Sequence, residues 1–284
     1  MGSTGEEKKT SVFLTALKWA VLLFLATVGV MVVFGLILGR LEGLSQGYLM
    51  ATFGWFGIII TGGIGTPVHE LSHYIMCKVF GYRVHELVLF RPFAAMQDGV
   101  LGYVSFSKDP TNLWQTLGSF FVGTAPMIFG PLLVLLLFRL MMPGAYQKVN
   151  EEIGTSLEDD NISIAAIFKM VFVVLREIMK QILDFDKKTF FSNFLFLYLT
   201  LCITSHTTLS TADIQNSLAG MAMVFGIFFL IGLLTAIAKQ NIAKDIMKIA
   251  LLIGSFFMMA LAFSALGTAL AYLFFVIKSV IWPF

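Results

Sequence analysis

Long runs of apolar residues joined by short polar links make up most of this chain. A helix that crosses a bilayer needs about 20 predominantly apolar residues in a row. The pattern therefore predicts an all-α polytopic membrane protein with about six transmembrane helices, built as one membrane-embedded domain over residues 1–284. The apolar runs cover approximately residues 13–38, 48–80, 114–140, 190–204, 218–238 and 249–282, and Arg40 and Glu42 are expected in a short glycine-containing loop after the first run.

Three stretches depart from this pattern. Residues 1–12 begin with a polar segment and are predicted to form a disordered tail. Residues 83–108 hold two short β-prone runs separated by a link with proline and glycine, which predicts a small β-hairpin or sheet. Residues 143–188 form a polar insert whose second half has the apolar spacing of an amphipathic helix, lying on the bilayer surface or capping the bundle.

Composition agrees with a membrane protein and excludes some functions. Of 284 residues, 58% are hydrophobic and only 13% are charged, whereas a soluble domain has about 25% charged residues. The net charge is +2 and no basic stripe is present, so no nucleic-acid partner is expected. Four histidines are too few for a membrane di-iron oxygenase. Lys8 and Lys9 favour a cytoplasmic N-terminus.

One H-E-x-x-H motif, His69-Glu70-Leu71-Ser72-His73, lies inside the second apolar run. Residues four apart share one face of a helix, so His69 and His73 can hold one metal ion, for which zinc is the best fit. Glu70 can then move protons beside that ion as the catalytic residue. An ordinary helix that happens to carry two histidines is the alternative, but ionisable groups at membrane depth by default mark function. One Zn²⁺ per chain is expected.

Prolines near the motif predict local irregularities in the apolar helices. Thr66 followed by Pro67 is typical of a helix start, which predicts a kink or a restart just before His69. Pro126 in the third apolar run would free backbone carbonyls that can face a cavity. Val104 and Phe106 lie in the second β-prone run, whose edge could hold a substrate as an added strand. Val104, Phe106 and Pro126 are therefore the candidate substrate-binding residues.

A third metal ligand must come from elsewhere in the chain, since a catalytic zinc normally has three protein ligands. If successive spans alternate in direction, the end of the fourth apolar run returns to the depth of His69. Asp213 is the first candidate there, and His206 is the alternative. Each also has a structural interpretation: His206 as an interfacial residue, and Asp213 as part of a capping box with Ser210.

These features together resemble the site-2-protease class of intramembrane zinc metalloproteases, the M50-like peptidases. The resemblance covers about residues 62–220 and rests on the H-E-x-x-H, the β-prone stretch after it and a loosely matched small-residue and proline motif at 123–131. It implies an aspartate from a later helix as third ligand, for which Asp213 is the best match, although the usual Asn-x-x-Pro lead-in and Asp-Gly pair are missing here. It also implies cleavage of a substrate's transmembrane helix near or within the bilayer.

The leading functional prediction is a zinc-dependent intramembrane endopeptidase that uses a metal-activated water to hydrolyse peptide bonds of a transmembrane protein substrate in the lipid bilayer. The alternative is a catalytically inactive scaffold or chaperone that retains the metalloprotease fold, against which the intact Glu70 argues. A transporter with a metal site would be expected to show inverted repeats, and the sequence shows none.

Overall fold

Helices dominate the computed structural model, which describes residues 3–157, 164–183 and 189–281. Within these ranges, four helical stretches are long and apolar enough to cross a membrane: Ser11–Phe53, Leu113–Met141, Thr211–Ile237 and Ala243–Ile281. The expected all-α architecture with a small sheet is confirmed at this level. The predicted count of six crossings is not reached by this measure.

The first and longest rod consists of α1 (Ser3–Phe24), a π-helical turn η1 (Leu25–Gly29) and α2 (Val30–Phe53). It ends at Gly54, whose φ of 63° breaks the helix. Two predictions are wrong here. The helix already begins at Ser3. Its glutamates and lysines are good helix formers, and no proline or glycine follows them within α1. The expected loop at Arg40–Glu42 is helical as well, because Glu42 finds polar partners inside the protein.

The metal motif lies on α3 (Trp55–Val79), which follows directly after Gly54. This helix runs through Pro67 without a restart, so of the two predicted irregularities before His69 the restart is wrong. The Thr66 hydroxyl is buried without a hydrogen-bond partner in the described structure and does not cap a helix. A proline is tolerated inside a helix where neighbouring helices pack around the freed backbone.

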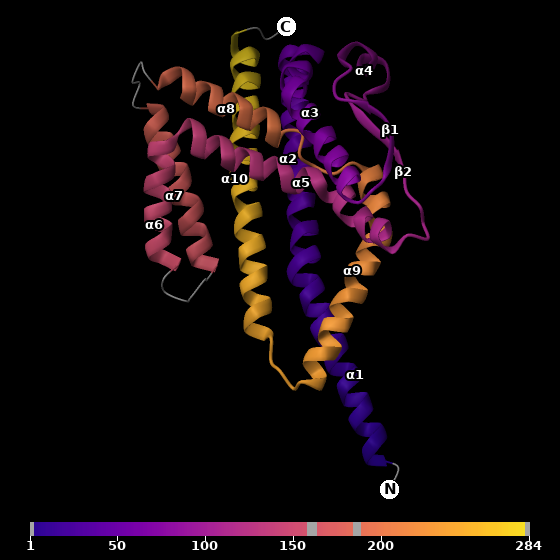
Figure 1. Cartoon of the computed structure of the whole chain (residues 1–284). Coiled ribbons are helices and arrows are strands. Elements are labelled where there is room, and N and C mark those ends of the chain that lie inside the picture. The colour runs from indigo at the N-terminus through magenta and orange to yellow at the C-terminus, as the bar shows by residue number, and fades with distance from the viewer. Residues whose placement is uncertain (1–2, 158–163, 184–188, 282–284) are drawn as a thin grey trace.

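The remaining long helices are α5 (Leu113–Met141), α9 (Thr211–Ile237) and α10 (Ala243–Ile281), with a shorter apolar helix, α8 (Phe190–Thr204). α1 packs against α9, α2 against α10, and α5 against both α3 and α9. In Figure 1 the rod and α10 run lengthwise, while α5 and α8 cross them, which brings α3, α5 and the start of α9 together. The metal motif therefore lies where helices from three parts of the chain meet.

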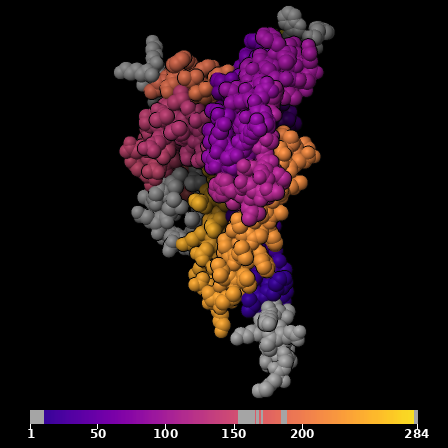
Figure 2. Space-filling view, turned by 45° about the vertical axis from the view of Figure 1, so that its right-hand side comes forward, coloured from indigo at the N-terminus to yellow at the C-terminus, as the bar shows by residue number. Residues whose placement is uncertain are grey.

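The hairpin predicted over residues 83–108 is confirmed as a two-stranded antiparallel sheet of β1 (Arg83–Val88) and β2 (Tyr103–Ser107). A bulge at His85 interrupts the pairing, and a short helix, α4 (Pro92–Asp98), which the sequence did not predict, connects the strands. Arg91 pairs with Asp98 across the two ends of α4. The violet-to-magenta surface in Figure 2 includes this segment, and the orange surface of α9 lies below it.

The polar insert forms α6 (Pro143–Leu157) and α7 (Ile164–Leu183); residues 158–163 and 184–188 of the predicted stretch lie outside the described ranges. The predicted amphipathic helix corresponds to α7, which packs against α6, α8 and α10 at the side of the bundle (Figure 1). Its buried Glu177 accepts hydrogen bonds from Lys180 and Arg176, which hold the pKa of that carboxyl below its usual value.

Candidate metal site

His69, His73 and Asp213 form a compact group of metal-ligand atoms at the junction of α3 and α9. The Nε2 atoms of the two histidines lie 3.1 Å apart. Oδ1 of Asp213 lies 3.2 Å from Nε2 of His73, and Oδ2 lies 3.7 Å from Nε2 of His69. Of the two third-ligand candidates, the structure thus places the Asp213 carboxylate beside both histidines.

Backbone carbonyls fix the tautomer of both imidazoles. Nδ1 of His69 donates to the His206 carbonyl, and Nδ1 of His73 donates to the Val122 carbonyl, each at 2.7 Å. A carbonyl oxygen can only accept, so Nδ1 must carry a hydrogen in both rings. In the neutral imidazoles Nε2 is then an acceptor, and both acceptors point toward each other and toward a carboxylate. Such a convergence of lone pairs suits a bound cation.

The Val122 carbonyl is available to His73 because of Pro126. In a regular helix the carbonyl of residue 122 would accept from the backbone N–H of residue 126, but proline has no N–H. Pro126 is fully buried inside α5. Pro126 therefore frees a backbone carbonyl, as expected, and this carbonyl is that of Val122. It faces the His73 ring, so the proline acts on the site through Val122.

Asp213 caps the start of α9 as well as belonging to the metal-ligand group. It is the third residue of α9, and with Ser210 it forms the predicted capping box: Oδ2 accepts from the Ser210 backbone N–H at 2.8 Å, and Ser210 Oγ accepts from the Asp213 N–H at 3.1 Å. Oδ2 serves the cap and also lies near His69, whereas Oδ1 makes the close approach to His73. The two interpretations offered for Asp213 are thus compatible, since one carboxylate reaches both the cap and the histidines.

Two glycines allow the helices to approach closely enough to assemble this group. A Cβ at Gly65 of α3 would collide with the Cys202 carbonyl and with the His206 ring. A Cβ at Gly123 of α5 would collide with the Asp213 carbonyl. Small residues at such crossings let helix backbones pack closely in membrane proteins. Gly65 therefore sets the distance between α3 and the His206 turn, and Gly123 sets the distance between α5 and the start of α9.

His206, the alternative ligand, contributes its backbone to the site. It lies in the turn after α8, and its side chain is 8% exposed. Its Nε2 lies 3.4 Å from the Thr61 hydroxyl, and its ring is not part of the metal-ligand group among the described residues. His85 lies in the β1 bulge, where its Nε2 is hydrogen-bonded to the Ser107 hydroxyl at 2.9 Å, and it is not part of the metal-ligand group among the described residues.

Glu70 lies next to His69 on α3 and is buried, with an exposed fraction of 8%. Within the described ranges no hydrogen bond engages its carboxylate, although it interacts electrostatically with His69 and Asp213. A carboxylate that is close to the metal-ligand group and not committed to another partner is free to exchange protons.

Glu42 is a site residue that the sequence analysis missed. From the middle of α2 its carboxylate accepts hydrogen bonds from Gln46 Nε2, at 2.9 Å, and from the Thr208 hydroxyl. Gln46 Nε2 also donates to the Ser205 carbonyl at 3.5 Å. Glu42 thus holds the 205–210 turn, which supplies the acceptor for His69 and the cap of Asp213. The sequence did contain a signal that Glu42 has buried partners, because a lone carboxylate in an apolar helix is costly without them.

The candidate substrate-binding residues lie in different surroundings. Val104 pairs with Leu87 in the middle of the sheet, and Phe106 packs its ring against Tyr82 with the ring centroids 5.5 Å apart. Pro126 is buried, so in this conformation it offers no surface to a substrate. The turn into β2 does approach the motif helix, since a Cβ at Gly102 would collide with the Thr66 side chain.

Comparisons with family models, with curated proteins and with solved structures found no match for this chain.

The residues present fit a zinc ion. Four-coordinate zinc with bond lengths near 2.0–2.1 Å keeps its ligand atoms about 3.3 Å apart. The closest separations in the group are 3.1 Å between the two Nε2 atoms, 3.2 Å from His73 Nε2 to Oδ1 of Asp213, and 3.7 Å from His69 Nε2 to Oδ2 of the same carboxylate, all near that value. Hydrogen bonds from the second ring nitrogen of each histidine to a carbonyl are also typical of metal-binding histidines.

Proposed function

We propose that this chain is a zinc-dependent endopeptidase that cleaves membrane-protein substrates inside or near the bilayer. The observation that carries the proposal is the convergence of His73 Nε2, His69 Nε2 and Asp213 Oδ1, with both imidazoles held by carbonyls in the tautomer that metal binding needs. Four helical stretches of the described chain are of membrane length, and two of them, α5 and α9, meet at this group beside α3. We further propose about six crossings, with α3 and α8 as the additional two, and a cytoplasmic N-terminus.

A zinc ion held by these three residues would polarise the substrate carbonyl and make a water acidic enough to attack it at neutral pH. Glu70 takes the proton of the attacking water and later delivers a proton to the leaving nitrogen. The Val122 and His206 carbonyls keep the two imidazoles oriented throughout. The inactive scaffold remains the competing function, and the chemistry of Glu70 separates the two.

Glu70→Gln removes the base and nearly preserves the shape of the side chain. Loss of a general base costs about 100- to 10,000-fold in rate. We therefore expect the Glu70→Gln protein to keep its fold and about one zinc per chain, and to co-purify with an uncut membrane-anchored partner. The measurement is the size of the associated membrane proteins in cells that make either form. If every associated protein has the same length in both, and either form rescues a deletion strain equally, the protease proposal fails and the scaffold takes its place.

We propose that the free edge of the β1–β2 sheet holds the substrate as an added strand, because the turn into β2 packs directly on the motif helix at Thr66. Proline cannot donate to a strand ladder. Val104→Pro is therefore expected to slow cleavage and to leave the zinc content unchanged. Unchanged turnover in Val104→Pro would place the docking site elsewhere.

A further inference from the structure

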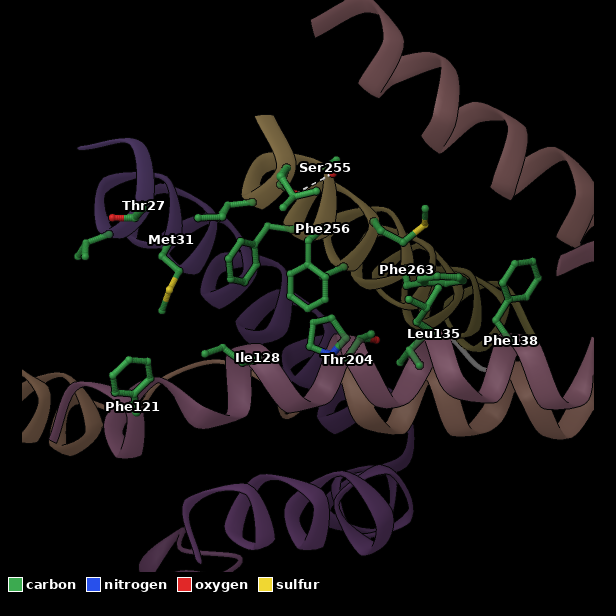
Figure 3. A pocket seen from close by; sticks show the side chains of 18 of the residues that line it. Thr27, Met31, Phe121, Ile128, Leu135, Phe138, Thr204, Ser255, Phe256 and Phe263 are labelled. Atoms are coloured by element: carbon green, nitrogen blue, oxygen red, sulfur yellow. Dashed lines mark hydrogen bonds between the residues drawn. The ribbon is translucent and has the colours of Figure 1, made fainter. Parts of the chain in front are cut away.

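A large apolar cavity lies between α5, α9 and α10, and none of the described residues that line it belongs to the motif helix α3. Its volume is about 830 Å³. In Figure 3, Met31 from α2, Ile128 from α5 and Phe256 from α10 face the same space. The cavity is therefore separate from the metal site, with α5 as part of the wall between them.

The walls are mainly hydrocarbon, and the polar side chains of the described lining are three hydroxyl residues together with Tyr146 and Asn150 of α6. The Thr27, Thr204 and Ser255 hydroxyls each donate to a carbonyl of their own helix, at 2.8, 2.9 and 2.8 Å. No charged side chain is among the described lining residues. A buried water needs two to four polar partners, so water cannot fill such a space well. An empty space would lose dispersion contacts along all of its walls. The occupant must be apolar.

Size distinguishes between apolar occupants. A helix is at least about 10 Å across, so 830 Å³ holds roughly 10 Å of helix, or less than two turns. A spanning helix needs about 30 Å, so only about a third of one would lie within this volume. Each methylene-sized group occupies about 30 Å³, close to the volume per molecule in liquid water. The cavity volume of 830 Å³ therefore holds about 28 such groups. One acyl chain has only about 16 carbons, so the space matches two chains.

We propose that this cavity binds the acyl chains of a membrane phospholipid, with the head group outside at the bilayer interface. A free fatty acid fits less well, because its carboxylate would find no cationic side chain among the described lining residues. The flanking helices α9 and α10 are of membrane length, so the lipid can enter from the bilayer. This proposal does not depend on the proposed hydrolysis.

The test uses the full chain reconstituted in phosphatidylcholine vesicles that contain a trace of phosphatidylcholine with a photoactivatable group near the end of one acyl chain. After illumination, labelled peptides are identified by mass spectrometry. We expect labels on inward-facing residues such as Phe228 and Phe256. Ala260, which lines the cavity and is 4% exposed, is replaced in Ala260→Phe to fill the space. Ala265 is an exposed residue on the same helix and supplies the matched control Ala265→Phe.

Ala260→Phe should reduce labelling of the cavity residues by about tenfold, while Ala265→Phe should label like the wild type. Val224→Phe, which fills the cavity from α9, serves if Ala260→Phe does not elute as a folded protein. Equal labelling in the cavity-filling and control variants would overturn the proposal. So would stronger labelling of the same residues by a photoactivatable fatty acid, or displacement of the label only by a synthetic transmembrane peptide.

Discussion

At the scale of single residues, the carboxylate of Asp213 serves both the cap of α9 and the metal-ligand group. Removing it in Asp213→Ala takes away both the cap acceptor and the oxygen near His73. We expect zinc occupancy and activity to fall together. A residue that served only as a cap would cost about 1 kcal/mol of helix stability and would leave zinc in place. Elemental analysis of the purified variants distinguishes the two cases.

His206→Ala is the companion variant for Asp213. It removes the imidazole but keeps the backbone carbonyl that accepts from His69. We therefore expect it to retain zinc. Full zinc in Asp213→Ala together with loss in His206→Ala would reverse the roles and make His206 the third ligand.

Glu42 acts on the site through the 205–210 turn, as a positioning residue. Glu42→Leu removes the acceptor for Thr208 and Gln46. Loss of a group that orients metal ligands typically costs about 10- to 100-fold in metal affinity. Glu42→Gln keeps one acceptor oxygen and should recover most of that affinity. Zinc affinity is measured by competition with a chelator.

The matched control for Glu42 is Glu177→Leu. This change also replaces a buried carboxylate, but on α7, where its partners are Arg176 and Lys180. It should destabilise the fold without changing zinc affinity. Equal zinc affinity in Glu42→Leu and Glu177→Leu would show that Glu42 has no special connection with the metal site.

At the scale of elements, α5 contributes a carbonyl to the site because its hydrogen-bond ladder is interrupted. Pro126→Ala restores a backbone N–H four residues after Val122, and this N–H competes with His73 for the Val122 carbonyl. We expect α5 to become a better helix and zinc affinity to fall by about tenfold or more. A gain in helix stability with a loss of metal affinity is the distinguishing result.

Pro131→Ala in the same helix is the control for Pro126. It restores an N–H toward the carbonyl of Met127, which has no role in the metal site. Zinc affinity should stay at the wild-type value. If Pro126→Ala and Pro131→Ala behave alike, the proline effect is a general property of α5.

At the scale of the whole molecule, the sequence predicted features that depend on local spacing. The apolar runs, the hairpin, the pairing of His69 with His73 and the Ser210–Asp213 capping box all follow from residues a few positions apart. The topology argument also anticipated that Asp213 returns to the depth of His69.

Features that depend on distant partners were not predictable in this way. A loop was expected at Arg40–Glu42 because charges usually leave an apolar helix, but Glu42 is satisfied by Thr208, 166 positions away. The continuity of α3 through Pro67 depends on the packing around it. The sequence suggested a freed carbonyl in α5, but only the fold shows that the Val122 carbonyl meets His73.

The π-helical turn η1 sets the relative phase of the two halves of the long rod. A π-turn holds one residue more than an α-turn, and each residue of a helix advances the side chains by about 100° around its axis. This offset lets a single continuous rod present one face to α9 before the turn and a different face to α10 after it. If that extra residue were absent and α1 kept its packing on α9, the side of α2 that carries Glu42 would be rotated by about 100° away from Thr208. The orientation of the metal site therefore depends on a residue count at Leu25–Gly29, far from the motif in sequence.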